Sequence, residues 1–168
     1  MIDLTTPLGE HTIDALCVGD VVSISGYIYT GRDAVLPLIV KASTEGSLPK
    51  LGIDLQGSVI FHTAVSPSGV GPTSSNKLEI EGSFAPLSKA GVKIHLSKGA
   101  IPPATVQALK ESNAVFAVMP PVTALLESQT LEREVVAYPG LGIEAFYRLR
   151  VENYQAIIAA AHRESLYD

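Results

Sequence analysis

The sequence predicts a single mixed α/β domain in which a partly parallel sheet is flanked by helices. Through the second half of the chain, short apolar segments typical of strands alternate with segments of helical periodicity, joined by connections of a few residues. This alternation is typical of parallel strands covered by helices, whereas the first third is richer in strands and less regular. The length of 168 residues suits one domain with its own core.

In the first third, four elements are expected: a strand over 2–6, a short helix over 10–16, a strand over 20–30 and a helix over 32–43. Gly26 interrupts a run of β-branched and aromatic residues, which predicts two short strands or one bent strand. Apolar residues at helical spacing after Gly31 place Arg32 and Asp33 in the first turn of the following helix.

The remaining expected strands cover residues 58–64, 92–96, 114–119, 135–138 and 148–151, and the remaining helices 78–90, 103–112, 122–127, 142–147 and 155–165. The last of these helices is predicted from its alanine content. Two glycines and Pro72 predict that the segment from Gly69 is a loop rather than a strand.

The composition points to a domain that covers part of its surface with a partner. Charged residues make up 17% of the chain, below the roughly 25% of an average soluble protein, and mean hydropathy is +0.28. A net charge of -5, with 12 scattered basic residues, argues against nucleic acid as a ligand. We therefore expect a protein partner.

No apolar run approaches the ~20 residues of a membrane span, and the N-terminus lacks a secretory pattern, so a cytoplasmic protein is expected. Cys17 is the only cysteine, which excludes an internal disulfide and a thiolate cluster held by this chain alone.

Four clusters at strand-to-helix junctions could carry chemistry, since α/β domains bind ligands there: residues 30–33, 71–79, 97–99 and 138–142. Arg32 could hold a carboxylate bidentately, or with Asp33 simply start a helix. Lys98 could present its ammonium at the edge of the sheet, or be a solvated loop lysine. Residues 138–142 read as a turn without a ligand.

The cluster at 71–79 combines three hydroxyls, a lysine and a helix start. Thr73, Ser74 and Lys77 could bind a carboxylate or phosphate beside unpaired backbone N–H groups. The alternative is an ordinary helix whose N-cap is Ser74 or Ser75.

The residues of this chain do not match three other common functional motifs. Asn76 and Leu78 replace the glycine and hydroxyl residue of a phosphate-binding P-loop. The four histidines lack metal-site spacing, and His62 and His95 read as core residues of apolar strands. No serine or cysteine stands in a nucleophile elbow.

An ordered series of motifs runs through most of the chain: residues 2–8, 18–22, 25–26, 28–33, 71–74, 98–99 and 138–145, with Val151. Together they resemble the beta subunit, or C-terminal domain, of the iron-sulfur hydro-lyases of the class I fumarase and L-tartrate dehydratase family. The resemblance implies a swivelling β/β/α domain that forms an oligomer with an alpha subunit. It also implies a [4Fe-4S] cluster that the alpha subunit binds, with no cofactor or metal bound by this chain.

The implied reaction is the reversible dehydration of a 2-hydroxy dicarboxylate such as malate or tartrate, with one iron acting as a Lewis acid. By resemblance, Arg32 and Lys98 bind substrate carboxylates, and Thr73 is a catalytic hydroxyl or proton relay with Ser74 beside it. Lys77 lies where the family has a carboxylate-binding arginine.

The chain departs from the family pattern at Ser74, Lys77 and Ser97, and at Leu36, where the family has a histidine. The alternative is therefore a diverged swivelling domain, without turnover, that has a structural or small-acid-binding role.

Overall fold

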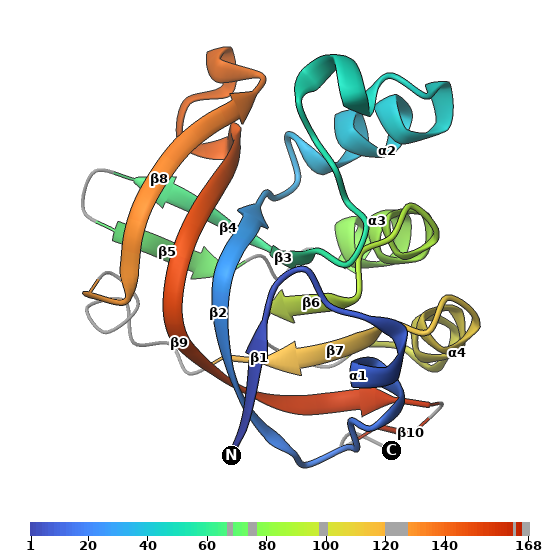
Figure 1. Ribbon diagram of the computed structural model, residues 1–168. Helices are drawn as coiled ribbons and strands as arrows, with labels where there is room; N and C mark the ends of the chain where they lie inside the picture. The colour runs from blue at the N-terminus through green and yellow to red at the C-terminus, as the bar shows by residue number, and fades with distance from the viewer. Residues whose placement is uncertain (67–68, 74–76, 98–100, 120–127, 163, 166–168) are drawn as a thin grey trace.

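The computed structural model describes residues 1–66, 69–73, 77–97, 101–119, 128–162 and 164–165, and of residues 66–81 and 165 within these ranges it describes the backbone only. The elements in chain order (Figure 1) are β1 (Ile2–Thr5), α1 (Glu10–Asp14), β2 (Val21–Thr30), α2 (Leu36–Glu45), the 3-10 helix η1 (Leu48–Leu51), β3 (Val59–Phe61), β4 (Thr63–Ser66), β5 (Gly69–Thr73), α3 (Lys77–Lys89), β6 (Ile94–Ser97), α4 (Pro103–Glu111), β7 (Val115–Val118), β8 (Thr130–Ala137), the 3-10 helix η2 (Pro139–Glu144), β9 (Phe146–Ala161) and β10 (Glu164–Ser165).

The main sheet is mixed and closes on itself like a barrel. Strands β2, β3, β6 and β7 are parallel neighbours in that order. The long strand β9 pairs antiparallel with both β7 and β2, so it joins the two ends of this parallel set. Strand β1 adds to β2 in parallel, and β8 adds to β9. The expected mixed, partly parallel sheet flanked by helices is confirmed.

Strand β9 corrects the prediction of a short strand followed by an alanine-rich helix over 155–165. It runs without interruption for 16 residues, and Ile157 pairs with both Val21 and Val118. Backbone partners on both sides outweigh the helix propensity of alanine, since propensity is a weak preference that tertiary pairing overrides.

Strand β2 is the single bent strand that was one of the two expected forms. Its pairing with β9 shifts register between Ile24 and Gly26. Gly26 has a φ of 110°, and a Cβ there would stand 2.5 Å from the Thr6 Oγ1 atom. Only glycine fits this bulge, which therefore fixes the bend of the strand.

The segment from Gly69 to Thr73 is not the expected loop. It forms β5, which pairs antiparallel with β4 in a separate two-stranded sheet. Proline is tolerated in such a ribbon because an edge strand does not need every N–H for pairing. The strand expected over 58–64 is divided at His62 into β3 and β4.

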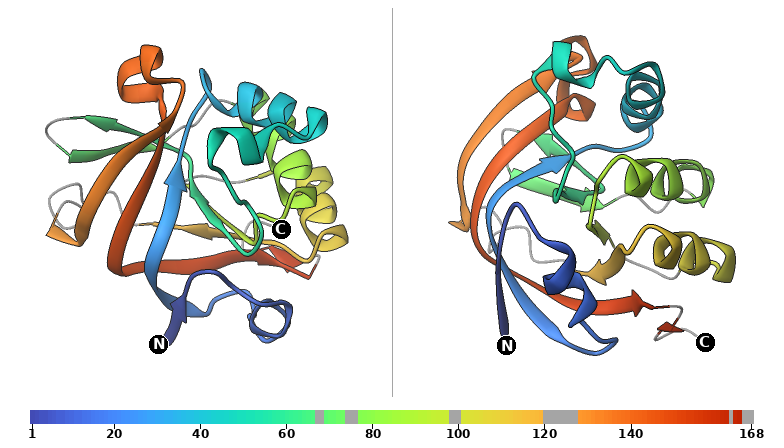
Figure 2. Two further views of the ribbon diagram at one scale, coloured as in Figure 1. Left: turned by 45° about the horizontal axis from the view of Figure 1, so that its top comes forward. Right: turned by 45° about the vertical axis from the view of Figure 1, so that its right-hand side comes forward.

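Helices α2, α3 and α4 lie side by side along one face of the curved sheet (Figure 2). Helix α2 begins at Leu36, four residues later than expected, with Pro37 in its first turn. The carbonyl of Arg32 accepts the Leu36 N–H at 3.0 Å, so Arg32 lies in a turn that leads into the helix.

The remaining predictions divide into three groups. Helices near 10–16, 78–90 and 103–112 and strands near 2–6, 92–96 and 114–119 are confirmed within a few residues, and the strand expected over 135–138 is the last part of the longer β8. The helix expected over 142–147 is instead η2 followed by the start of β9. The helix expected over 122–127 lies outside the described residues.

Apolar side chains form one core inside the closed sheet and two more under the helices. The inner core contains Phe61 and Tyr154, and the outer cores lie beneath α2 and beneath α4. In the described part of the chain, no helix has the length and apolarity to cross a membrane. The outer cores hold the helices against the sheet and so keep the strand ends in fixed positions.

Candidate functional site at the carboxyl edge of the sheet

The carboxyl ends of β2, β3, β6 and β7 lie side by side, and we call this border the carboxyl edge. Thr30 is opposite Phe61, Phe61 is opposite Leu96, and Leu96 is opposite Ala117. Residues that follow these positions leave the sheet together, and open α/β sheets bind ligands beyond such strand ends. Two of the four sequence clusters, 30–33 and 97–99, start at this border.

Arg32 leaves the carboxyl edge one residue after Gly31. The Gly31 N–H donates to the Phe61 carbonyl at 3.2 Å, which continues the pairing of β2 with β3. A Cβ on Gly31 would stand 2.8 Å from Val35 Cγ1 and 2.9 Å from Leu36 Cδ2. A side chain at this position would therefore displace Val35 and Leu36, so glycine allows the start of α2 to pack closely against the chain just before Arg32.

The Arg32 guanidinium is oriented by an ion pair with Glu144. Arg32 Nε donates to Glu144 Oε1 at 3.2 Å, and the side chains are 25% and 28% exposed. In the described part of the chain this pair uses Nε, which leaves the two Nη nitrogens to face another acceptor. The geometry suits bidentate binding of a carboxylate from a solvent-accessible side.

Glu144 lies just after residues 138–142, which were interpreted as a turn without a ligand, and within the helix expected over 142–147. It ends η2, whose entry needs Tyr138 at a φ of 57° and whose course needs Gly142 at a φ of 61°. The prediction assigned this segment no part in the site, whereas the structure joins it to Arg32. The presence of this acidic residue in a motif shared with a hydro-lyase family was the available signal.

Thr73 reaches the carboxyl edge through the hairpin. Its backbone pairs with Thr63, which begins β4 one residue after His62 and so lies just beyond the end of β3. The described backbone therefore brings Thr73 to the same border as Arg32. Its side chain is not among the described ones.

The other predicted site residues are placed through their elements alone. Lys77 is the first residue of α3, and its side chain is not described. Lys98 directly follows the last residue of β6, Ser97, and Ser74 directly follows Thr73; both Lys98 and Ser74 lie outside the described residues. Both neighbouring elements end at the carboxyl edge.

A buried polar chain lies beneath this edge. Ser88 Oγ lies 2.8 Å from His95 Nε2, and His95 Nδ1 lies 3.0 Å from His62 Nε2. Both histidines are fully buried, as core histidines are, and Phe84 stacks on the His95 ring at 4.3 Å. Burial, and secondarily the neighbouring His62, lowers the pKa of His95 well below its usual value, so this imidazole is neutral at pH 7.

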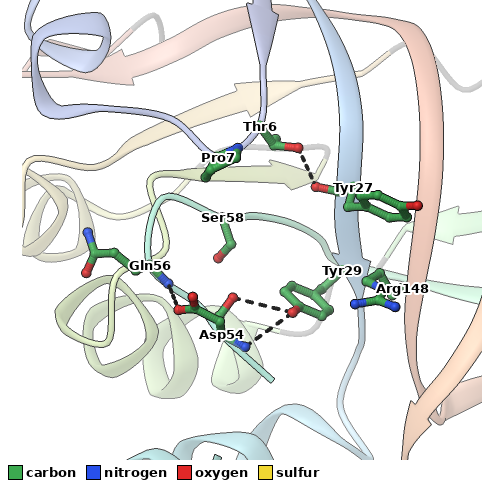
Figure 3. Close-up of a pocket in the computed structure, with 8 residues that line it drawn as sticks. All are labelled: Thr6, Pro7, Tyr27, Tyr29, Asp54, Gln56, Ser58 and Arg148. Atoms are coloured by element: carbon green, nitrogen blue, oxygen red, sulfur yellow. Dashed lines mark hydrogen bonds between the residues drawn. The ribbon is translucent and has the colours of Figure 1, made fainter. Parts of the chain in front are cut away.

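A polar cavity of about 230 Å³ lies elsewhere, near the amino end of β3 (Figure 3). Its lining residues are Thr6, Pro7, Tyr27, Tyr29, Asp54, Gln56, Ser58 and Arg148. The hydroxyl of Tyr29 is within 3.4 Å of the Asp54 carbonyl and 3.3 Å of its N–H, while Arg148 is paired with Glu134. None of the predicted site residues lines this cavity. Two polar atoms of its lining residues, Ser58 Oγ and Arg148 Nε, are buried without a hydrogen-bond partner among the described residues.

The described residues do not offer a site for a metal or an iron-sulfur cluster. Cys17 is exposed, and among the described side chains no three of the His, Cys, Asp and Glu type converge. A [4Fe-4S] cluster is held by several cysteine thiolates, whereas the chain contains one cysteine. The donor set therefore does not fit such a cluster.

Comparison with known proteins identifies the family. The family described as fumarase C-terminus matches residues 1–167. The chain belongs to the fumarase C-terminus family. This membership confirms the resemblance that the ordered motifs indicated.

Relatives within and around the fumarase C-terminus family carry two kinds of name. A putative fumarate hydratase class I of Geobacillus stearothermophilus is 31% identical over 182 residues, which cover 100% of this chain and 34% of that protein. The L(+)-tartrate dehydratase subunit beta of Escherichia coli (strain K12) is 28% identical over 169 residues, covering 94% of this chain and 81% of that protein. A putative L(+)-tartrate dehydratase subunit beta of Methanocaldococcus jannaschii is 29% identical over 177 residues, covering 96% and 88%.

The fumarase C-terminal chain described here thus spans about a third of the fumarate hydratase relative and most of each tartrate dehydratase beta subunit. In the longer relative the corresponding sequence is one portion of a larger protein.

Proposed function

We propose that this chain is the substrate-facing beta subunit of a hydro-lyase of the fumarate hydratase or tartrate dehydratase type. It catalyses, with a partner, the reversible dehydration of a 2-hydroxy dicarboxylate: malate to fumarate, or tartrate to oxaloacetate. The observation that supports the proposal is that Arg32 and the backbone of Thr73 lie at one carboxyl edge, where β6, which Lys98 follows in the sequence, also ends.

The cationic residues bind the two carboxylates of the substrate. Arg32, held through Nε by Glu144, offers its two Nη nitrogens to one carboxylate as a planar fork. Lys98, which follows the last residue of β6 in the sequence, binds the other carboxylate as a point charge, and Lys77, the first residue of α3, adds a second ammonium. Charges at fixed places orient the acid before it reacts.

The hydroxyl residues serve the proton transfer. Dehydration removes a proton from one carbon and a hydroxide from its neighbour, so a proton acceptor must lie within hydrogen-bond reach of that carbon. Thr73 takes this place as a catalytic hydroxyl or proton relay, and Ser74 follows it in the sequence.

The partner is an alpha subunit that holds a [4Fe-4S] cluster. The relatives named subunit beta support a second kind of subunit. The single cysteine of this chain supports placing the cluster on that partner. A low charged fraction and exposed apolar side chains such as Ile143 and Ile157 are consistent with a covered surface.

A second candidate is a diverged domain without turnover that binds a small acid or has a structural role. Leu36 favours it, because this position carries a histidine in the family pattern and here is a fully buried residue of the core beneath α2. The polar group that the family has at this position is absent.

The test is co-expression with the cluster-bearing alpha subunit, followed by anaerobic assay with malate, fumarate, tartrate and mesaconate. Turnover of one of these acids that requires both chains supports the enzyme. An iron-loaded complex that turns over none of them overturns it. Saturable binding of an acid without turnover would favour the second candidate.

A further inference from the structure

The strongest feature outside the residues assigned above is the buried chain of Ser88, His95 and His62. It consists of two hydrogen bonds, of 2.8 and 3.0 Å, among three side chains that are at most 3% exposed. Neither the sequence motifs nor the proposed reaction gives these residues a role. Burying two adjacent imidazoles costs more desolvation free energy than filling the same space with apolar side chains.

Each member of the chain comes from a different element. Ser88 is in the last turns of α3, His95 is in β6, and His62 lies between β3 and β4. The two hydrogen bonds therefore join a helix to one parallel strand and that strand to the end of its neighbour. Phe84 of α3 adds contacts with both rings, at 4.3 Å from His95 and 4.4 Å from His62.

These three elements carry the predicted substrate groups. Helix α3 begins at Lys77, β6 leads directly into Lys98, and His62 precedes Thr63, whose backbone pairs with Thr73. Hydrogen bonds are directional, so this chain defines the positions of the three elements more narrowly than apolar packing does.

We infer that Ser88, His95 and His62 are positioning residues, which set the places of α3, β6 and the start of β4 relative to one another and so position the predicted substrate groups that begin or follow these elements. The inference rests on the proposed function for the identity of the substrate. The contacts support it: Ser88 Oγ lies at His95 Nε2 and His95 Nδ1 lies at His62 Nε2, so the tautomer of His95 couples the directions of the two hydrogen bonds.

The test compares two variants that each remove one buried hydroxyl. Ser88→Ala removes the end of the chain, and Thr105→Val removes a buried hydroxyl from α4, which carries none of the predicted substrate groups. In the anaerobic complex with the alpha subunit, we expect Ser88→Ala to lower kcat/KM about tenfold. Thr105→Val should lose a similar amount of Tm but keep the wild-type kcat/KM. Ser88→Thr, which restores a hydroxyl, should recover part of the loss. Equal kcat/KM in Ser88→Ala and Thr105→Val would overturn the inference while leaving the proposed function intact.

A second readout uses the chain itself and does not depend on turnover. Imidazole ¹⁵N resonances report the tautomer of each histidine, and Ser88→Ala should shift those of both His95 and His62, whereas Thr105→Val should shift neither. Amide hydrogen exchange in residues 63–77 should be faster in Ser88→Ala than in the wild type. If the wild-type complex were inactive, the proposed function would fail, and unchanged exchange in this segment would separately overturn the positioning role.

Discussion

Arg32 Nε donates to Glu144 Oε1 at 3.2 Å, and the two residues are 112 positions apart in the chain. The pair joins the turn that follows β2 to the 3-10 helix that precedes β9. Because the carboxylate of Glu144 occupies one side of the guanidinium, the remaining side points in a fixed direction. The binding geometry of Arg32 is therefore a property of two distant motifs together.

Replacing Arg32 tests whether its fork binds substrate. Arg32→Lys should lower kcat/KM about a hundredfold, because one ammonium cannot serve Glu144 and a substrate carboxylate with the same geometry. The measurement is anaerobic steady-state kinetics of the two-chain complex. Arg150→Lys, which alters a surface ion pair with Glu132, is the matched control and should retain the wild-type rate.

Replacing Glu144 separates orientation from charge. Glu144→Gln keeps an oxygen acceptor for Arg32 Nε but removes the negative charge, so a loss of about tenfold in kcat/KM is expected, mostly through KM. Glu144→Ala removes the acceptor as well and should cost more. An alanine variant with wild-type KM would show that Glu144 does not orient Arg32 for binding.

The Thr73 hydroxyl is tested by an isosteric change. Thr73→Val retains the shape and the strand pairing with Thr63 but removes the hydroxyl, so kcat should fall by about a hundredfold or more while the complex stays intact. Thr73→Ser, which keeps the hydroxyl, should retain most of the activity. Similar rates in the two variants would exclude a role for the hydroxyl.

The buried His95 predicts a pH dependence of stability. Its pKa is lowered in the folded chain by burial and by His62, so below about pH 6.5 the unfolded chain binds a proton that the folded chain does not. The contribution of His95 to the free energy of unfolding should be constant above about pH 6.5. As the pH falls below that value, this contribution should decrease by at most about 1.4 kcal/mol per pH unit.

Urea unfolding of the wild type and of His95→Gln at several values between pH 5 and 7.5 measures this contribution. The variant should show a shallower decrease on acidification, since other titrating groups are common to both proteins. The same slope in both would mean that His95 does not titrate between the folded and unfolded states.

Local sequence was sufficient to predict the elements whose hydrophobic pattern matches their burial in the fold. The apolar runs that became β6 and β7 are buried on both faces, as in parallel sheets covered by helices, so their hydrophobicity alone identified them. The start of α4 was equally clear, because Pro103 occupies its first turn.

Elements that depend on distant partners could not be predicted in this way. The second half of β9 is strand because β2 and β7 pair with it, and no local feature of residues 155–161 reports those partners. Likewise, β5 forms a hairpin with β4 although its two glycines and proline predict a loop. In both cases non-local backbone pairing outweighs local propensity.

The candidate site was predicted in its residue types but not in its connections. Arg32 and Thr73 were identified from motifs; the parallel pairing of β2 with β3 and the hairpin that follows β3 bring their backbones to the same edge. The Arg32–Glu144 pair and the link between His62 and His95 join segments far apart in sequence, so neither could be inferred before the strand order was known.

The central claim is that the carboxyl edge binds the dicarboxylate in an active site shared with a cluster-bearing subunit. Its most direct test is kcat/KM of the anaerobic two-chain complex that carries both Arg32→Ala and Lys98→Ala, compared with the wild type at equal iron content. We predict active wild type and a loss of at least about a thousandfold in the double variant, since both carboxylate contacts are removed. Wild-type kcat/KM in the double variant, with the complex and its iron intact, would contradict the claim.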